Sequence, residues 1–517
     1  MFSGESFGLQ ALGWMATIFV FSLAILIIFL IGVYIADVTQ TRQAIRRNYP
    51  VIGHFRYFFE HIGTFFRQYF FTMDRDEMPF NRAQRSWVYR AAKDVDNTVA
   101  FGSTRDLSPS GTVFFINTAF PTLGKDAVKC IPVVIGENSA ATPYTAHSIF
   151  NISGMSFGAI SKPAVQALSY GALKANAWMN TGEGGLSPYH LESGADIVFQ
   201  IGTAKYGVRD SEGNLSDEKL RALSAHESVR MFEIKMSQGA KPGKGGILPA
   251  AKVDEEISKI RGIPIHTDSI SPNRHIELET NDDLIDMIHH IRKVTSKPVG
   301  FKAVFGDKTW LCEFLEAVNK RGKEYAPDFI TVDSADGGTG AAPMSLMDYV
   351  GMPIHESLPM VIDSICKAGL RDRVKVIASG KLINPAEVAW ALCVGADFIT
   401  SARGFMFSLG CIQALQCHEN TCPTGITTHN KKLQGGLVAE QKSSRVTSYI
   451  KHIAYEVGLI AHSCGVRSPR ELTRHHARVV QGNGISVVLA DIYPDICAAN
   501  STCLVETKKN IPKVVRN

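Results

Sequence analysis

Eight short β-rich runs alternate with helical patterns along most of this 517-residue chain, and this alternation restricts the fold more than any other feature. Helical stretches with good starts lie between many of the runs: Ser161 with Pro163 begins the stretch to Ala175, and Asn384 with Pro385 begins the stretch to Val394. Eight such units favour an α/β fold of the (β/α)8 TIM-barrel type, with a doubly wound sheet as the alternative. The predicted strands are 148–152, 177–181, 196–202, 232–237, 298–305, 328–334, 374–379 and 397–402.

Glycine-rich loops follow the last three predicted strands: DGGTGAAP (336–343), SGK (379–381) and ARG (402–404). Barrels often bind phosphate in the loops after strands seven and eight, and Gly380 and Gly404 allow the backbone to approach an anion while Arg403 adds a fixed charge. No G-x-G-x-x-G follows a strand and opens a helix, and GAKPGKGG (239–246) lacks the spacing of a phosphate loop. The pattern indicates a phosphate-bearing cofactor, and flavin mononucleotide (FMN) fits it better than NAD.

Three cysteines lie close together directly after the last predicted strand, in GCIQALQCHENTCPTGITTH (410–429). The spacing is C-x5-C-x4-C, and such density in a cytoplasmic protein indicates a metal site. Zinc would need a fourth ligand, such as His418 or His429. An iron–sulfur cluster held by three thiolates is the other option. The seven remaining cysteines are scattered, and most are expected to be small core residues: Cys130, Cys312, Cys366, Cys393, Cys464, Cys497 and Cys503.

The N-terminal segment contains 31 residues, Ser6 to Ala36, without a charged side chain or a histidine. This length suffices for a transmembrane helix. A cleaved signal peptide fits less well because Glu5 precedes the run, no basic residue does, and no A-x-A site follows. Basic residues follow the run instead, and the positive-inside rule places residues 40 onward in the cytoplasm. These basic residues are Arg42, Arg46, Arg47 and Arg56.

The segment after the predicted anchor repeats aromatic residues near a helical period over residues 55–71. Such a stripe could lie in the lipid headgroup layer or pack on the following domain. We therefore expect three parts: a transmembrane anchor (1–40), a juxtamembrane extension (41–140), and a barrel (141–517) that includes the cysteine segment 410–429.

Composition excludes several classes of protein. An apolar content of 45% with 20% charged residues is typical of a folded globular chain and not of a disordered one. The net charge is +5, from 54 basic and 49 acidic residues, which gives no reason to expect a nucleic acid partner. We expect a small-molecule substrate instead.

Five motifs occur in one order, and together they resemble the FMN-binding synthase domain of glutamate synthases. They are ISGMSFGAIS (152–161), NTGEGG (180–185), IKMSQGAKPGKGG (234–246), DGGTGAAP (336–343) and GCIQALQCHENTCPTG (410–425), and the resemblance runs from about Ser148 to Val480. It implies a barrel that binds FMN and a [3Fe–4S] cluster, in an oxidoreductase acting on CH–NH2 donors. The expected reaction forms L-glutamate from 2-oxoglutarate and ammonia. Electrons would pass from ferredoxin or a partner subunit to the cluster and then to FMN.

The resemblance also implies roles for particular residues. Lys302 and Glu183 would be catalytic, with Lys302 stabilising reduced FMN. The residues expected to bind 2-oxoglutarate are Gln238, Lys241 and Arg261, and the cluster ligands are Cys411, Cys417 and Cys422. The residues expected around the flavin are Met155, Ser156, Thr181, Lys302, Gly337, Gly338, Gly380, Ala402 and Arg403.

The sequence departs from the family pattern at two positions near these motifs. Leu186 stands where the family usually has an acid, and Ile247 stands where it has glutamine. The glutaminase domain and the C-terminal β-helix domain of the full-length enzymes have no counterpart here. Two alternatives follow: a membrane-bound electron-transfer module without 2-oxoglutarate chemistry, or a synthase of an N-substituted glutamate.

Overall fold

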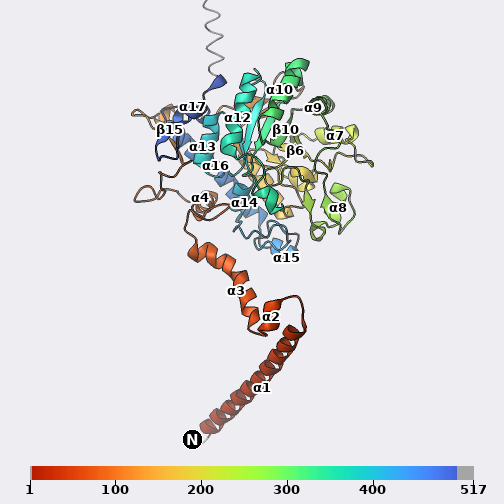
Figure 1. Cartoon of the computed structure of the whole chain (residues 1–517), viewed down its shortest axis with the longest axis vertical. Coiled ribbons are helices and arrows are strands. Elements are labelled where there is room, and N and C mark those ends of the chain that lie inside the picture. Colours follow the sequence, from red (N-terminus) through yellow and green to blue (C-terminus); the bar gives the residue numbers. More distant parts are fainter. Residues whose placement is uncertain (1–2, 498–517) are drawn as a thin grey trace, which may run out of the picture. The chain divides into compact units, whose positions relative to one another are not determined.

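The computed structural model describes residues 3–497, which fall into two units that divide between Ala83 and Gln84. The second unit contains a closed barrel of eight parallel strands, so the predicted TIM barrel is confirmed (Figure 1). Each predicted strand overlaps one barrel strand. In barrel order these are β4 (Phe150–Ile152), β5 (Met179–Asn180), β6 (Ile197–Ile201), β7 (Val229–Lys235), β10 (Val299–Val304), β11 (Phe329–Asp333), β12 (Lys375–Ser379) and β13 (Phe398–Ser401).

Helices follow the strands as expected for a barrel, and several begin with a side-chain cap. Asn384 accepts a hydrogen bond from the Glu387 N–H at the start of α13, so the expected helix start carries a capping box. Ser161 precedes α5 but does not cap it, because its hydroxyl donates to the Gly425 carbonyl at 2.7 Å. The longer helices of this unit are α5 (Lys162–Lys174), α7 (Asp217–Ser224), α9 (Asn281–Thr295), α10 (Thr309–Arg321), α12 (Ile354–Lys367), α13 (Pro385–Val394) and α16 (Ala439–Ser463).

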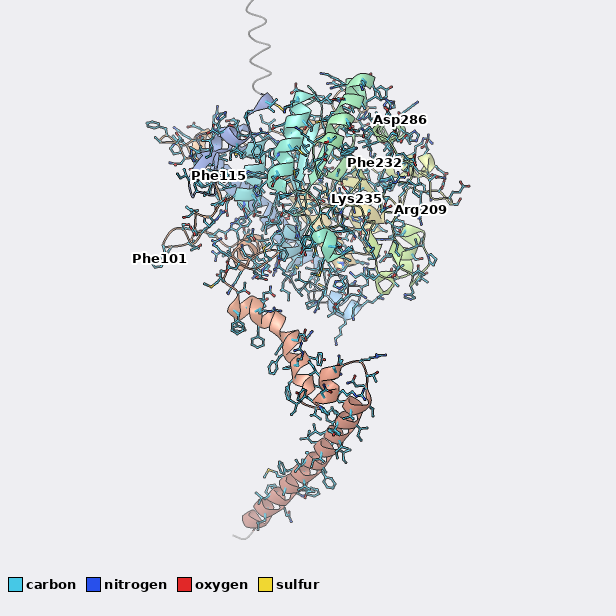
Figure 2. All side chains as sticks on the ribbon, in the orientation of Figure 1. Phe101, Phe115, Arg209, Phe232, Lys235 and Asp286 are labelled. Atoms are coloured by element: carbon cyan, nitrogen blue, oxygen red, sulfur yellow. A yellow bond between two sulfur atoms is a disulfide. The ribbon has the colours of Figure 1, made fainter. Side chains whose placement is uncertain are left out.

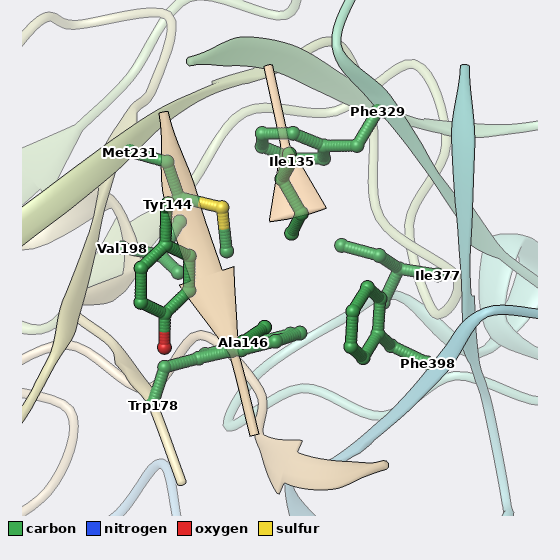
Figure 3. Close-up of a cluster of buried hydrophobic side chains, with 9 residues drawn as sticks. All are labelled: Ile135, Tyr144, Ala146, Trp178, Val198, Met231, Phe329, Ile377 and Phe398. Carbon is green, nitrogen blue, oxygen red and sulfur yellow. The ribbon is translucent and has the colours of Figure 1, made fainter. Parts of the chain in front are cut away.

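A hairpin before the barrel closes its N-terminal end. Strands β2 (Val133–Ile135) and β3 (Tyr144–Ala146) pair antiparallel, and their buried side chains pack against others at or near the start of barrel strands (Figure 3). The closed end leaves the carboxyl ends of the strands for chemistry. This apolar cluster comprises Ile135, Tyr144, Ala146, Trp178, Val198, Met231, Phe329, Ile377 and Phe398.

Residues 84–139, which the sequence assigned to a separate extension, belong to the same compact unit as the barrel. Besides the hairpin, β1 (Val113–Phe115) pairs antiparallel with β14 (Ala477–Val480), which also pairs with β15 (Ser486–Val488). These strands have three or four residues each. Segments this short give almost no periodic signal, which is why the sequence placed the boundary later.

The first unit begins with α1 (Ser3–Thr39), whose segment from Phe7 to Thr39 is long and apolar enough to cross a membrane. Signal sequences near an N-terminus pass the same test. At the end of α1 the buried Asp37 carboxylate accepts from the Val51 N–H and contacts His54 Nε2, each at 2.9 Å. These contacts fix the turn between α1 and the helices α2 (Ala44–Asn48) and α3 (Gly53–Phe66), which η1 (Arg67–Phe71) continues.

Two of the scattered cysteines are not simple core residues as expected. Cys366 in α12 forms a disulfide with Cys497, and their Cα atoms are 5.2 Å apart. Thiols are kept reduced in the cytoplasm, so in the placement that the flanking arginines predict this pair would be held as two thiols. Cys393 and Cys464 are buried, as predicted, and Cys503 lies outside the described residues.

Candidate active site

A buried ion pair lies where β5 and β7 end. Lys235, which is labelled in Figure 2, is the last residue of β7. Its Nζ is 2.9 Å from Oε1 of Glu183, which lies in the short helix η3 (Gly182–Gly184) after β5. The Glu183 carboxylate fills the space beside Gly246, where an added Cβ would lie 2.3 Å from Oε1. Gly246 is therefore required so that this carboxylate can approach Lys235.

Two further cations act on the same carboxylate. Lys241 and Arg261 are 3% and 5% exposed, so neither is a solvated surface charge. Burial opposes ionisation of Glu183, but Lys235, Lys241 and Arg261 outweigh it and lower its pKa. Three cations thus act on one carboxylate, which leaves these four side chains with two net positive charges.

Hydrogen bonds position the cations through neighbouring loops. Lys241 Nζ donates to the Ala341 carbonyl at 3.1 Å, which ties it to the glycine-rich loop after β11. Arg261 ends α8 (Glu255–Arg261) and donates from Nη1 to the Ser269 hydroxyl at 2.9 Å. Burial and the charge of Lys235 lower the pKa of Lys241 to about 8. Lys241 therefore carries its charge at neutral pH and loses it in mildly alkaline solution.

Lys302 lies near the end of β10, inside the barrel. Its Nζ is 3.0 Å from Oδ2 of Asp333, the last residue of β11, and both side chains are buried. Burial disfavours the ammonium, but Asp333 and Glu233 outweigh this effect and raise the pKa of Lys302. A small cavity lies beside Lys302 within the barrel, and its polar lining includes Glu233 and Thr400.

The loops after β11, β12 and β13 meet as the sequence predicted. An added Cβ on Gly380, whose φ is +126°, would lie 2.1 Å from the Ser334 hydroxyl, and one on Gly338 would lie 2.6 Å from Arg403 Nε. Burial lowers the pKa of Arg403 to about 10, well within the charged range at neutral pH, and its guanidinium donates to the Asp336 carbonyl. The Ser334 hydroxyl is buried without a partner in the described structure. Gly337 and Ala402 belong to the same loops.

The remaining residues expected around the flavin lie at the ends of β4 and β5. Met155 and Thr181 are buried, and Ser156 accepts a long hydrogen bond of 3.4 Å from Arg261 Nη2. An added Cβ on Gly182 would lie 2.6 Å from the Ser156 N–H nitrogen, so these two loops touch through their backbones. The structure thus brings the expected flavin residues and the expected substrate residues to one end of the barrel.

The three cysteines of segment 410–429 act on one another electrostatically. Burial raises the pKa of the Cys411 thiol to about 12, and Cys417 and Cys422 contribute to this rise. The Gln413 N–H donates to Cys411 Sγ at 3.4 Å, and Cys422 Sγ lies 3.3 Å from the Thr424 hydroxyl. Such hydrogen bonds to sulfur are typical of iron–sulfur sites.

The described residues do not contain a ready-made site for a single ion. Within residues 3–497, no group of three or more His, Cys, Asp or Glu side chains is gathered closely enough to hold one metal ion. His429 Nε2 is 2.9 Å from the Gly158 carbonyl, and His418 is an exposed neighbour of Glu419. Zinc would need its ligands about 2.0–2.3 Å from one ion, whereas a cluster spreads its thiolates over several irons.

Sequence reasoning missed two residues that the structure makes prominent. Lys235 lies within the motif IKMSQGAKPGKGG, but nothing in its spacing distinguished it from a strand residue. Lys252 is buried and donates to carbonyls of the cysteine segment more than 160 positions away. Its partners are so distant in sequence that no local pattern could have identified it.

The fold and the site define a parallel barrel with a buried cationic group at its carboxyl end and three cysteines close together in sequence after its last strand. Residues 114–467 match the conserved region in glutamate synthase. The chain is 39% identical over 492 residues to the glutamate synthase large subunit-like protein YerD of Bacillus subtilis (strain 168), covering 88% of this chain and 93% of that protein. It therefore belongs to the glutamate synthase family of oxidoreductases.

Other relatives match over the barrel. The archaeal-type glutamate synthase [NADPH] of Thermotoga maritima is 32% identical over 335 residues, which cover 64% of this chain and 62% of that protein. Among solved structures, the recombinant flavin-binding domain of baker's yeast flavocytochrome b2 aligns over 87% of this chain and 88% of that one, with 14% identity and a TM-score of 0.44.

Proposed function

We propose that this chain is a flavin and iron–sulfur oxidoreductase that forms L-glutamate from 2-oxoglutarate and ammonia. The observation that carries the proposal is the buried group formed by Lys235, Lys241 and Arg261 around Glu183. Its two net positive charges match a dicarboxylate, which carries two negative charges. A buried excess of charge is costly unless a partner arrives, so an anionic substrate is the natural complement.

Roles within this group follow from position and ionisation. Lys241 and Arg261 would bind the carboxylates of 2-oxoglutarate, with Gln238 donating from its amide. Glu183 is held ionised by its cations, so it would act as the counter-charge of an ammonium or iminium nitrogen and not as an acid. The reaction consumes 2-oxoglutarate, ammonium, two electrons and two protons, and it releases glutamate and water.

The barrel residues fit FMN. Gly338 and Gly380 leave no room for side chains beside Arg403 and Ser334, so the backbone is open to a phosphate there. The unpartnered hydroxyl of Ser334 adds a donor for such an anion. FMN, when bound, would supply the two-electron chemistry that reduces the imine carbon. Lys302, kept protonated by Asp333, would stabilise negative charge on the flavin ring system.

The cysteine segment fits a [3Fe–4S] cluster held by Cys411, Cys417 and Cys422. The segment places Gln413, Leu415 and Asn420 in the left-handed backbone region, with φ values of 58°, 57° and 62°. Non-glycine residues in this backbone region are strained and are frequent at functional sites, so their presence here supports a functional role for this loop. Electrons would enter here from a ferredoxin or a partner subunit.

We also propose that α1 anchors the chain in a membrane as a single pass, with the barrel unit in the cytoplasm. The support is the charge-free run of α1 and the arginines that follow it. Exposed aromatic residues of α3 and η1 would then lie in the headgroup layer, since such rings favour the membrane interface. These include Phe55, Phe58, Phe59, Phe66 and Phe70.

The test uses the full chain purified anaerobically in detergent. We expect flavin absorption bands, a broad iron–sulfur shoulder and an electron paramagnetic resonance signal in the oxidised state. Protein reduced by dithionite should convert 2-oxoglutarate and ammonium to glutamate, detected by mass spectrometry. Stoichiometric zinc without iron would refute the cluster, and cofactor-loaded protein without saturable 2-oxoglutarate binding would instead favour the electron-transfer module.

The same assay distinguishes the product. Leu186 and Ile247 are half-buried apolar residues close in sequence to Glu183 and Lys241, at positions where the family usually has polar residues. If methylamine is used with a higher kcat/KM than ammonium, the product is an N-substituted glutamate. We expect ammonium to be preferred, because Glu183 and Lys235 make the nearest contacts polar.

A further inference from the structure

Lys252 is a buried cation with an unusual set of partners. It ends the short helix η4 (Ala250–Lys252), the residue is 2% exposed, and its Nζ donates to the carbonyls of Cys417 and Thr427, each at 2.7 Å. A third, longer contact of 3.4 Å reaches the Ala159 carbonyl. Within residues 3–497, no carboxylate lies within ion-pair distance of this ammonium.

A buried ammonium that contacts only carbonyl groups lacks a negative charge to neutralise it. Carbonyl dipoles satisfy its three N–H groups but do not neutralise its charge, and buried charges are usually paired or neutralised. The groups that favour the charged form of Lys252 electrostatically are Cys417 and Cys422. As thiols these atoms are neutral, so they provide a negative charge only when they are held as thiolates.

A three-iron cluster would supply that charge. Three ferric ions and four sulfides carry one formal positive charge, so three thiolate ligands leave the group with two negative charges, and reduction adds a third. A fixed cation next to the cluster therefore stabilises the reduced form more than the oxidised form. Hydrogen bonding, net charge and burial are the levers by which a protein sets such a potential.

We propose that Lys252 is the counter-charge of the iron–sulfur cluster and raises its reduction potential, an inference that rests on the cluster in the proposed function. Lys252 is a positioning residue, because it reaches the cluster through Cys417 and Thr427 and is not itself a ligand. Its contact with Ala159 lies on the loop after β4 that also carries Met155 and Ser156. One ammonium thus holds the cysteine segment against a loop expected to face the flavin.

The segment that presents Lys252 supports this role. It begins at the end of β7, carries Lys241 near its start and ends with Arg261, so both substrate cations and the cluster counter-charge belong to one excursion of the chain. Asn420 donates from Nδ2 to the Ala251 carbonyl at 3.1 Å, which fixes the neighbouring backbone of the same excursion to the cysteine segment. The cation is therefore held in place from both sides.

The test compares Lys252→Met and Lys252→Gln, which remove the charge, with Lys252→Arg, which keeps it. Lys259→Met is the matched control, because Lys259 is exposed on α8 seven positions further along. Full-length proteins are loaded anaerobically, iron is quantified, and the cluster is titrated redox-electrochemically with detection by electron paramagnetic resonance. The neutral variants should lower the equilibrium constant for reduction at least tenfold, which is about 59 mV for one electron. Lys252→Arg should remain close to the parent protein, and Lys259→Met should not change.

Each outcome decides the point. An unchanged potential in iron-loaded Lys252→Met or Lys252→Gln overturns the role of Lys252 and leaves the cluster itself intact. If both neutral variants lose iron while Lys252→Arg retains it, the charge is required to hold the cluster, which supports the proposal. If all three variants lose iron equally, shape and not charge is what matters, and the proposal fails. A parent protein without iron overturns the cluster and this role together.

Discussion

Replacing Lys241 by alanine tests the charge balance on which the proposed substrate depends. Lys241 is buried, its Nζ donates to the Ala341 carbonyl, and it acts on Glu183 together with Lys235. Two unit charges 4 Å apart interact by about 4 kcal/mol at an effective dielectric constant of about 20. Truncating one partner of a buried charge pair costs about 2–5 kcal/mol. We therefore expect 2-oxoglutarate binding to weaken by roughly 30- to 700-fold, which corresponds to about 2–4 kcal/mol.

The assay is isothermal titration of 2-oxoglutarate into oxidised full-length protein, with flavin content measured in the same preparation. Lys244→Ala is the matched control, because Lys244 lies on the same loop but is exposed. Its loss should change the dissociation constant by less than about threefold, since exposed charges are screened. Equal effects in the two variants would show that only the general field of the loop matters. An unchanged affinity in Lys241→Ala would refute a dicarboxylate site at this position.

Three further predictions concern pH, stability and the anchor. Because the pKa of Lys241 is about 8, its charge is lost as pH rises, so 2-oxoglutarate affinity should be constant below about pH 7 and fall about tenfold per pH unit above 8. Titration calorimetry at several pH values checks this profile, and Lys241→Arg should flatten it. Asp328→Asn should reduce the free energy of unfolding by about 3–5 kcal/mol in chemical denaturation, because Asp328 is fully buried between Arg292 and Arg373. The control Asp286→Asn, at an exposed position, should change the free energy of unfolding by less than about 0.5 kcal/mol. Deleting residues 1–40 should release the protein from the membrane fraction with its flavin retained, and continued membrane association would assign the attachment to the aromatic face of α3.

The barrel could be predicted from the sequence because its strands carry a signal that does not depend on distant contacts. A strand buried on both faces is a short run of β-branched and aromatic residues, and β11 and β13 have this form. The N-terminal hairpin could not be predicted in the same way. Its two strands have three residues each, and Tyr144 becomes recognisable as a core residue only through its contact with Trp178.

The hydrogen bond of Ser161 and the disulfide of Cys366 also could not be predicted, because the partner of each residue is distant in sequence. Ser161 has the sequence context of a helix cap, yet its hydroxyl bonds to Gly425, 264 positions away. A polar side chain near a helix start satisfies whichever acceptor the tertiary fold supplies, and here that acceptor belongs to the cysteine segment. The local sequence likewise predicts Cys366 only as a core residue of α12, because its disulfide partner lies 131 residues further along the chain.

For the candidate site, the sequence suggested which residues take part, and the structure gave the net charge of the group that they form. The resemblance implied Lys241, Arg261 and Glu183 as site residues, but it could not give the size of the net charge. The net charge of the group is +2 because Lys235 adds a third cation through its 2.9 Å contact with Glu183, and Gly246 leaves the space in which that contact forms. With two cations the carboxylate would leave a single positive charge, which suits a monocarboxylate as well as a dicarboxylate. With three cations the site favours a dianion, and this preference depends on a lysine that the sequence did not distinguish from an ordinary strand residue.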